Sequence, residues 1–458
     1  MPVRELYQGQ HPLTPPPSDP LVGSGRRVGG NYGAIVALSA GLLAAVAGVA
    51  WWLHNVPGRG AEASMSLLIG AAFGIIMQRG RFCFFCIFRD LIEGKNSGPF
   101  YALLSALAMG SVLYVVVFGA FLPNPATGRL PPDAHIGPVS WVLVMAGVAF
   151  GLGMALSGAC VSGHLYRLGE GYSRAPIALL GTLVGFGLGF MTWRPFYLSS
   201  ISTAPVLWLP HYLGYGGALA LQLVLLGLLA LALMRYLPPG KGQGVEDGRP
   251  GTVGDSPPDA RENPQDSGRD VRQGSREHGL QSHGGEKVTL ASVWQRVFQR
   301  RWPPGITGAA VGVLGAVAYL RVAPLGVTSQ IGSIARTLMT EWNLLEGRLN
   351  GLDSFSGCVT RVIHTISNNG LLISALVVGS LAMALVSGRF ELTRLTWRNA
   401  TTALAGGILM GWGSMLALGC TVGTLLSGTM ALAVSGWVFF GAVFTGVWAG
   451  IKLRLHRI

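Results

Sequence analysis

Cysteine thiols are the chemically distinctive side chains of this sequence, and Cys83 and Cys86 form a C-x-x-C pair. A zinc site would need a second pair of ligands at a suitable spacing, and the sequence offers none. A dithiol redox site would need the strand and helix of a soluble thioredoxin-like fold, whereas this pair stands in the apolar segment RGRFCFFCIF. The pair therefore predicts neither a metal centre nor a redox site, and no cofactor is expected.

Two further cysteines stand in a glycine pattern that occurs twice. Gly147 begins the segment GVAFGLGMALSGACVSG, which contains Cys160, and Gly407 begins GILMGWGSMLALGCTVG, which contains Cys420. Four glycines and the cysteine match at one constant offset of 260 residues, from Gly147 to Gly407. A free cysteine in an apolar helix is usually a small buried hydrophobe. Its repetition within the same glycine pattern favours a functional role for both thiols.

The composition shows what kind of structure must position these thiols. Only 12% of the 458 residues are charged, against about 25% in an average soluble domain. The mean hydropathy is +0.47. Runs of about 20 apolar residues span a bilayer as helices. The sequence therefore predicts an all-α, polytopic membrane protein embedded in the lipid bilayer.

Ten apolar runs are long enough to span the membrane, and short re-entrant helices are expected beside them. The first run is too long for the core of a cleaved signal peptide, so it predicts a retained helix. The ten runs cover residues 32–53, 62–78, 99–122, 139–157, 175–193, 215–234, 305–323, 370–387, 400–417 and 431–451.

A polar segment divides the membrane region into two parts. Residues 238–293 contain Gly, Pro, Ser and charged residues with almost no apolar ones, which predicts a disordered linker. We therefore expect an N-terminal tail with an extra membrane helix at 1–61, a first membrane repeat at 62–237, the linker at 238–293, and a second membrane repeat at 294–458.

The net charge of +13 raises the question of a nucleic-acid partner. The basic residues are instead scattered singly between apolar runs, as in membrane loops. With ten spans, most Lys and Arg outside the linker fall on the side of both termini and of the loops near 79–98, 158–174 and 388–399. Short cytoplasmic loops collect such residues. We therefore expect cytoplasmic termini and no nucleic-acid partner.

This topology makes the two glycine-rich copies cross the membrane in opposite directions. The repeats would then be inverted and pseudo-symmetric, as in many transporters. A weaker echo links GAAFG at Gly70 with GAAVG at Gly308. Glycine lets helices approach closely and permits a helix to break inside the membrane. The glycines expected to support breaks beside the thiols are Gly158, Gly163, Gly419 and Gly423.

A third break is expected before the C-x-x-C pair. There a short half-helix is predicted to begin near Arg81, with Cys83 facing the pathway. Arg81 either attracts an anion or marks the cytoplasmic boundary of the membrane. A re-entrant turn is also expected at PLGVTSQ, residues 324–330.

The predicted spans contain almost no Asp or Glu. Carriers coupled to protons or cations usually hold carboxylates inside the membrane. A pathway with thiols, helix ends and flanking arginines fits an anion or a neutral, polarisable solute, and an exposed sulfur on that solute would match the thiols. No nucleotide-binding G-x-x-x-x-G-K-[ST] pattern occurs, so ATP hydrolysis within the chain is not expected.

Three cysteine motifs resemble the YeeE/YedE family of bacterial inner-membrane proteins: RGRFCF around Cys83, SGACVSGHLYRLGEG around Cys160 and GWGSMLALGCTVGTLLSG around Cys420. The resemblance covers residues 62–237 and 294–458. It implies an inner-membrane transporter for thiosulfate uptake, and not an enzyme. It further implies that the anion passes the three thiols by transient S–H hydrogen bonds, and that a small cytoplasmic sulfur-carrier protein of the TusA/SirA type is a partner.

Two alternatives stay open. The solute is either thiosulfate or another sulfur or selenium compound, since some family members are associated with selenium. A membrane sulfurtransferase, with a persulfide on Cys83 or Cys86, is the alternative from another class. The sequence leaves open the roles of Cys86 and Cys358, the order of the thiols along the path, the energy source and the oligomeric state.

Overall fold

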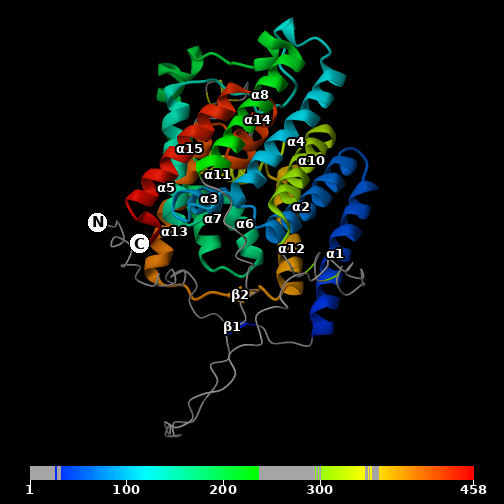
Figure 1. The fold of residues 1–458 in the computed structure, drawn as a ribbon. Coiled ribbons are helices and arrows are strands. Elements are labelled where there is room, and N and C mark those ends of the chain that lie inside the picture. Colours follow the sequence, from blue (N-terminus) through cyan, green and yellow to red (C-terminus); the bar gives the residue numbers. More distant parts are fainter. Residues whose placement is uncertain are drawn as a thin grey trace, which may run out of the picture.

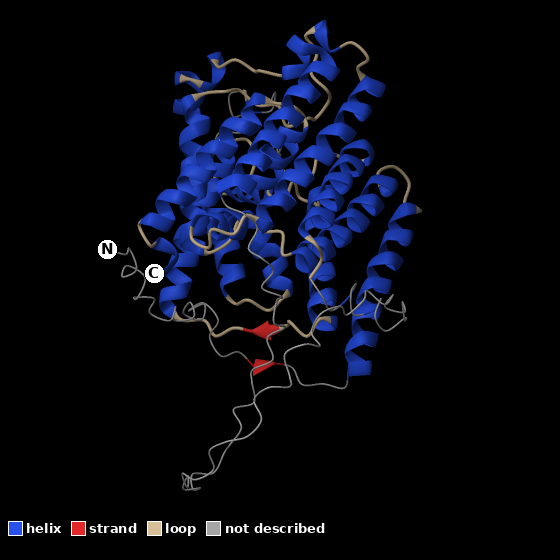
Figure 2. Ribbon diagram, viewed as in Figure 1, coloured by secondary structure: helices blue, strands red, loops and turns tan. Residues whose placement is uncertain are grey.

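The computed structural model describes residues 26–27, 32–236, 294, 298, 301–345, 349, 351–352 and 361–457. The predicted linker at 238–293 and Cys358 lie outside the described residues. Within them, helices dominate, and two short strands, β1 (Arg26–Arg27) and β2 (Glu391–Leu392), pair antiparallel at one end of the helical bundle (Figures 1 and 2).

Ten long helices correspond one by one to the predicted apolar runs. Nine of the described helices are long and apolar enough to span a membrane, and α13 adds a tenth span together with the bent segment that follows it. The all-α, polytopic prediction is therefore confirmed. The long helices are α1 (Tyr32–His54), α2 (Gly60–Gly80), α4 (Gly98–Phe121), α5 (Trp141–Ser157), α7 (Arg174–Ser199), α8 (Leu209–Tyr236), α10 (Pro304–Arg321), α12 (Asn368–Val386), α13 (Trp397–Leu416) and α15 (Val434–Lys452).

Local sequence explains where several of these helices begin. A Ser or Thr hydroxyl at a helix start accepts a hydrogen bond from a backbone N–H of the first turn, which otherwise has no partner. Such caps are Ser140 before α5, Ser367 before α12 and Thr396 before α13. The outer faces carry large exposed apolar side chains such as Val116, Leu180 and Leu228, as expected for surfaces that contact lipid.

Four long helices are each followed by a shorter helical segment. These are α3 (Phe84–Ile92) after α2, α6 (Val161–Gly169) after α5, α11 (Ser329–Glu341) after α10, and the π-helix η5 (Thr421–Ser427) with α14 (Gly428–Met430) after α13. The chain bends by 46° between α13 and the segment Thr421–Met430. Single 3-10 turns are η1 (Pro125–Thr127), η2 (Ile201–Thr203) and η6 (Leu455–Arg457).

The helices pack in a pattern that occurs twice. Helix α2 packs on α12 and α4 on α10, while α7 packs on α13 and α5 on α15; α5 and α13 also pack on each other. Exchanging α2 with α10, α4 with α12, α5 with α13 and α7 with α15 converts this set of contacts into itself. Helix α1, the predicted extra span, lies outside the pattern and packs on α2 and α12 (Figure 1).

Glycines bring these helices into backbone contact. A Cβ atom at Gly70 in α2 would stand 2.1 Å from the carbonyl oxygen of Leu372 in α12. One at Gly308 in α10 would stand 1.9 Å from the carbonyl oxygen of Ala102 in α4. Only a residue without Cβ fits either place. The same close contact therefore occurs in both halves, whereas the inverted orientation of the halves and their boundaries stay predictions.

Candidate functional site

Three cysteines share one local structure, because each is the residue directly before a shorter helical segment. Cys83 precedes α3, Cys160 precedes α6 and Cys420 precedes η5, all with extended backbone. All three side chains are completely buried. The first N–H groups of a helix lack intrahelical partners and carry partial positive charge. Each thiol therefore lies where an anion would be stabilised.

A left-handed residue stands two positions before each of these cysteines. Arg81 has φ 50°, Gly158 has φ 81° and Leu418 has φ 56°. This backbone conformation ends the preceding long helix, and it is easily adopted only by glycine. The helix break at Gly158 could therefore be predicted from the sequence. The helix breaks at Arg81 and Leu418 could not be predicted, because a left-handed conformation is unusual for these residue types.

The four glycines predicted to support the breaks occupy two kinds of position. Gly158 and Gly419 lie between the long and the short helix, whereas Gly163 and Gly423 lie in the first turn of α6 and η5. A Cβ at Gly163 would stand 2.9 Å from Cys83 Sγ and 3.4 Å from Cys160 Sγ. Gly163 therefore leaves room for two thiols to meet.

The Cys83 thiol lies close to the thiols of Cys160 and Cys86. The Cys160 sulfur also accepts a hydrogen bond from the backbone N–H of Gly163 at 3.3 Å. It lies 3.3 Å from Ser162 Oγ. Three thiols thus form a chain in the order Cys160, Cys83, Cys86, with polar donors at its Cys160 end.

Arg167 terminates the thiol chain at its other end. Its Nη2 donates a hydrogen bond to Cys86 Sγ at 3.2 Å, and its Nη1 donates to the carbonyl oxygen of Gly158 at 3.0 Å. From the sequence, Arg167 was noted only as part of the motif around Cys160, and no role was predicted for Cys86. The contact between them joins residues of α3 and α6 that are 81 positions apart, which no local spacing along the chain reveals.

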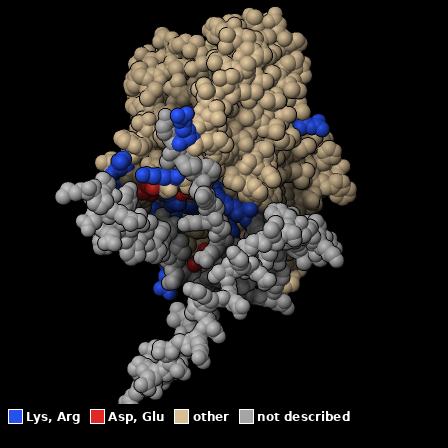
Figure 3. All heavy atoms as spheres, viewed as in Figure 1, with Lys and Arg blue, Asp and Glu red and all other residues tan. Residues whose placement is uncertain are grey.

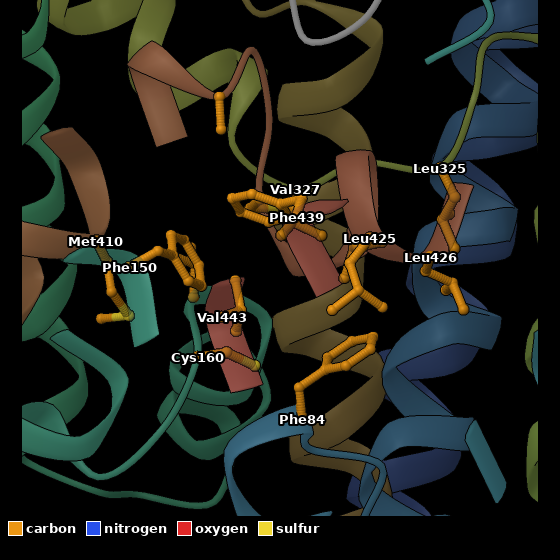
Figure 4. Packing of buried hydrophobic residues seen from close by; sticks show 14 of the residues in the cluster. Phe84, Phe150, Cys160, Leu325, Val327, Met410, Leu425, Leu426, Phe439 and Val443 are labelled. Carbon is orange, nitrogen blue, oxygen red and sulfur yellow. The ribbon is translucent and has the colours of Figure 1, made fainter. Parts of the chain in front are cut away.

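Apolar side chains surround the thiols. Cys83, Cys160 and Cys420 belong to one buried cluster that also contains Phe84 and Leu425. Figure 4 shows Cys160 in this cluster together with Phe84, Leu425 and Val443, which come from α3, η5 and α15. Apolar walls exclude water and strengthen the electrostatic effect of the helix ends. The exposed Arg81 lies outside this cluster, at the end of α2.

The fourth short helix has a hydroxyl where the others have a thiol. Thr328 directly precedes α11, its side chain is completely buried, and its Oγ1 has no hydrogen-bond partner among the described residues. It lies within the predicted turn at 324–330. No feature of the sequence marked Thr328 itself, because a single Thr in an apolar chain is common.

Comparison with known proteins gives a consistent family. A family model described as Sulphur transport matches residues 79–449, which contain all four short helices. The chain is 26% identical over 407 residues to "Thiosulfate transporter TsuA" of Escherichia coli (strain K12), which covers 85% of this chain and 94% of that protein. It is 27% identical over 406 residues to "Thiosulfate transporter TsuA" of Spirochaeta thermophila, covering 85% and 98%. A shorter match, 28% identical over 132 residues, links 29% of the chain to 30% of "Probable transporter YedE" of Salmonella typhimurium.

Proposed function

Because the chain belongs to the sulphur-transport family, we propose that it carries thiosulfate across the bacterial inner membrane into the cytoplasm by way of Cys420, Cys160 and Cys83. The observation that carries the proposal is that all three thiols are buried at the starts of short helices within one apolar cluster. Relatives that cover 85% of the chain are named thiosulfate transporters.

The chemistry of these positions suits thiosulfate. Its two negative charges favour the helix N-termini, where N–H groups point outward. Its terminal sulfur is soft and accepts weak hydrogen bonds from S–H groups. A thiolate would repel the dianion, so the proposed pathway requires neutral thiols that form no covalent bond to the solute. Several weak sites in sequence allow the anion to leave as readily as it enters.

The contact between Cys83 and Cys160 supports an order for the thiols. Cys83 and Cys160 lie next to each other, and Cys86 and Arg167 continue the chain beyond Cys83. We therefore place Cys420 first, Cys160 second and Cys83 last on the way to the cytoplasm.

The distribution of charge supports cytoplasmic termini. In Figure 3 the visible Lys and Arg lie from about mid-height downward, toward the end that carries β1 and β2 in Figure 1, and the top of this face has none. Cytoplasmic loops collect such residues. A small sulfur-carrier protein of the TusA/SirA type, suggested by the family resemblance, would receive the anion on this side.

Flux of radiolabelled thiosulfate into proteoliposomes tests the proposal, with and without an imposed proton gradient. Sulfate is the matched competitor, because it has the same charge and a similar shape but no terminal sulfur. We expect unlabelled thiosulfate to compete and sulfate to compete weakly. Stronger competition by sulfite or selenite would reassign the substrate, and a stable mass increase on Cys83 or Cys86 after exposure to thiosulfate would favour a persulfide mechanism instead.

A further inference from the structure

A second feature, separate from the three pathway thiols, is a basic pocket between α6, the start of α7 and the segment joining α12 to α13. It is small, with about 30 Å³ of space for the centres of water-sized molecules, and it is partly open to solvent. Its lining includes Arg167, Arg174 and Arg394, together with His164 and Asn399. The described residues that line it include no carboxylate. The pocket is therefore built for a negatively charged ligand.

Two buried nitrogen atoms of the pocket residues have no hydrogen-bond partner among the described residues. They are Nε2 of His164, whose side chain is only 2% exposed, and Nε of Arg174. Buried polar atoms in proteins almost always have a partner. His164 lines the pocket, so its unpaired Nε2 can donate a hydrogen bond to an oxygen atom of a ligand when this nitrogen carries the ring proton.

The pocket continues directly from the thiol chain. Arg167 lines the pocket and at the same time donates a hydrogen bond to Cys86 Sγ. His164 stands one helical turn after Cys160 on α6, so both lie on the same side of this short helix. Arg167 and α6 thus connect the place where the thiols meet with the place where the arginines gather.

The positive charge of the pocket is only weakly compensated. Glu170 lies next to Arg167 at the end of α6, but its Oε1 accepts a hydrogen bond from Gln78 Nε2 at 3.3 Å. Burial raises the pKa of Glu170, and the positive charge of nearby Arg167 opposes this shift. Arg174 donates to the Thr402 hydroxyl at 2.9 Å, a neutral partner. The guanidinium groups therefore keep capacity for an anion.

We propose that this pocket binds the transported dianion after it leaves the thiols, as the last binding site before release on the cytoplasmic side. This inference rests on the proposed function. Arginines recognise the oxygen atoms of a small oxyanion through paired N–H donors. The pocket has no thiol among its described lining residues, so it selects charge and oxygen atoms and not sulfur. It should bind sulfate as well as thiosulfate, unlike the thiol pathway.

A cysteine reporter in the pocket tests this selectivity. The full-length Asn399→Cys variant in nanodiscs is labelled with a maleimide at constant ionic strength. The labelling rate of the unmodified chain, measured in parallel, is subtracted. We expect thiosulfate and sulfate to slow labelling several-fold and an uncharged sulfone to have no effect. Thr393→Cys, also at the pocket, serves as a second reporter if Asn399→Cys does not elute as a single species in size-exclusion chromatography.

Two arginine variants in the reporter background identify the source of the binding. Arg394 is exposed and lines the pocket, whereas Arg398 is exposed and does not. Arg394→Gln should raise the anion concentration for half-protection by about two- to fivefold, and Arg398→Gln should leave it unchanged. An equal effect of both variants would mean that general surface charge, and not the pocket, causes the protection, and it would overturn the proposal.

The outcomes separate this proposal from the proposed function. Absence of protection by either anion, in a protein whose thiosulfate uptake is intact, would overturn the pocket and leave the transport function standing. Protection by both anions in a protein without thiosulfate uptake would keep the pocket and reject the transport function. Protection by thiosulfate alone would mean that the reporter senses the thiol pathway, and it would also overturn the pocket.

Discussion

The thiols of Cys83 and Cys160 meet at the starts of two different short helices, in a space that Gly163 leaves open. Neither helix could provide this arrangement alone, because each supplies one thiol. The contact therefore links the first half-helix of the chain to the second. It is also the part of the proposed pathway that substitutions can test most directly.

Removal of any one pathway thiol should slow thiosulfate uptake. We expect Cys83→Ala, Cys160→Ala and Cys420→Ala each to lower the uptake rate by about tenfold or more, a loss of roughly 1.4 kcal/mol or more of stabilisation. Serine should retain part of the rate, since its hydroxyl still donates a hydrogen bond. Uptake into proteoliposomes, normalised to reconstituted protein, gives the measurement. Normal rates in all three alanine variants would exclude the thiol pathway.

Gly163→Ala should impair uptake more than it impairs folding. Its Cβ would stand 2.9 Å from the Cys83 sulfur, so the two thiols must separate. The matched control is Gly119→Ala in α4, where a Cβ meets nothing within 4 Å. The control should keep full uptake and gain up to about 1 kcal/mol of helix stability. Equal uptake in both variants would show that the thiol contact is dispensable.

The two equivalent helix contacts should respond alike to an added methyl group. Gly70→Ala and Gly308→Ala each force a Cβ against a backbone carbonyl oxygen of the facing helix. We expect each to destabilise the protein by about 1 to 3 kcal/mol, while Gly227→Ala in α8, where a Cβ meets nothing within 4 Å, should not. Thermal unfolding in detergent measures the difference. Tolerance at one position and not at the other would argue against equivalent halves.

His135, in the connection between α4 and α5, should make stability depend on pH. Burial lowers the pKa of His135 to about 4, from about 6.5 in the unfolded chain. Below about pH 6.5 the unfolded chain takes up a proton that the buried His135 does not. The free energy of unfolding should therefore fall by up to about 3 kcal/mol as the pH is lowered from 6.5 toward 4. His135→Gln should flatten the unfolding temperature over this range.

A control separates this effect from general acid denaturation. His54→Gln changes an exposed histidine at the end of α1 and should leave the pH profile of unfolding as it is. If His135→Gln and the unmodified chain lose the same stability between pH 7 and pH 4, the proton uptake lies on other groups.

The sequence predicted the structure best where hydrophobicity alone determines it, namely in the membrane-spanning helices. Every predicted span corresponds to a helix, because a long apolar run has few other structures in lipid. Gly158 marked one break, since glycine favours the left-handed conformation that ends a helix. The breaks at Arg81 and Leu418 were hidden, because packing imposes that conformation on residues that do not prefer it.

Contacts between distant segments were beyond reach of the sequence. Thr328 takes the place of a cysteine at the fourth short helix, and nothing in its local sequence distinguishes it from other threonines. The basic pocket combines residues of α6 and α7 with Arg394 from the segment before α13. Such groups can be found only when the helices are placed in space.

The glycine contacts limit how the bundle can move. Where backbone lies on backbone, as at Gly70 and Gly308, no side chains are present to change rotamer and absorb a sliding motion. The long helices therefore form a stiff frame, and we expect any opening of the path to involve the short helices inside it. A displacement of α3 or α6 as a unit would move a pathway thiol with it. The element that opens the path would then also carry the binding site.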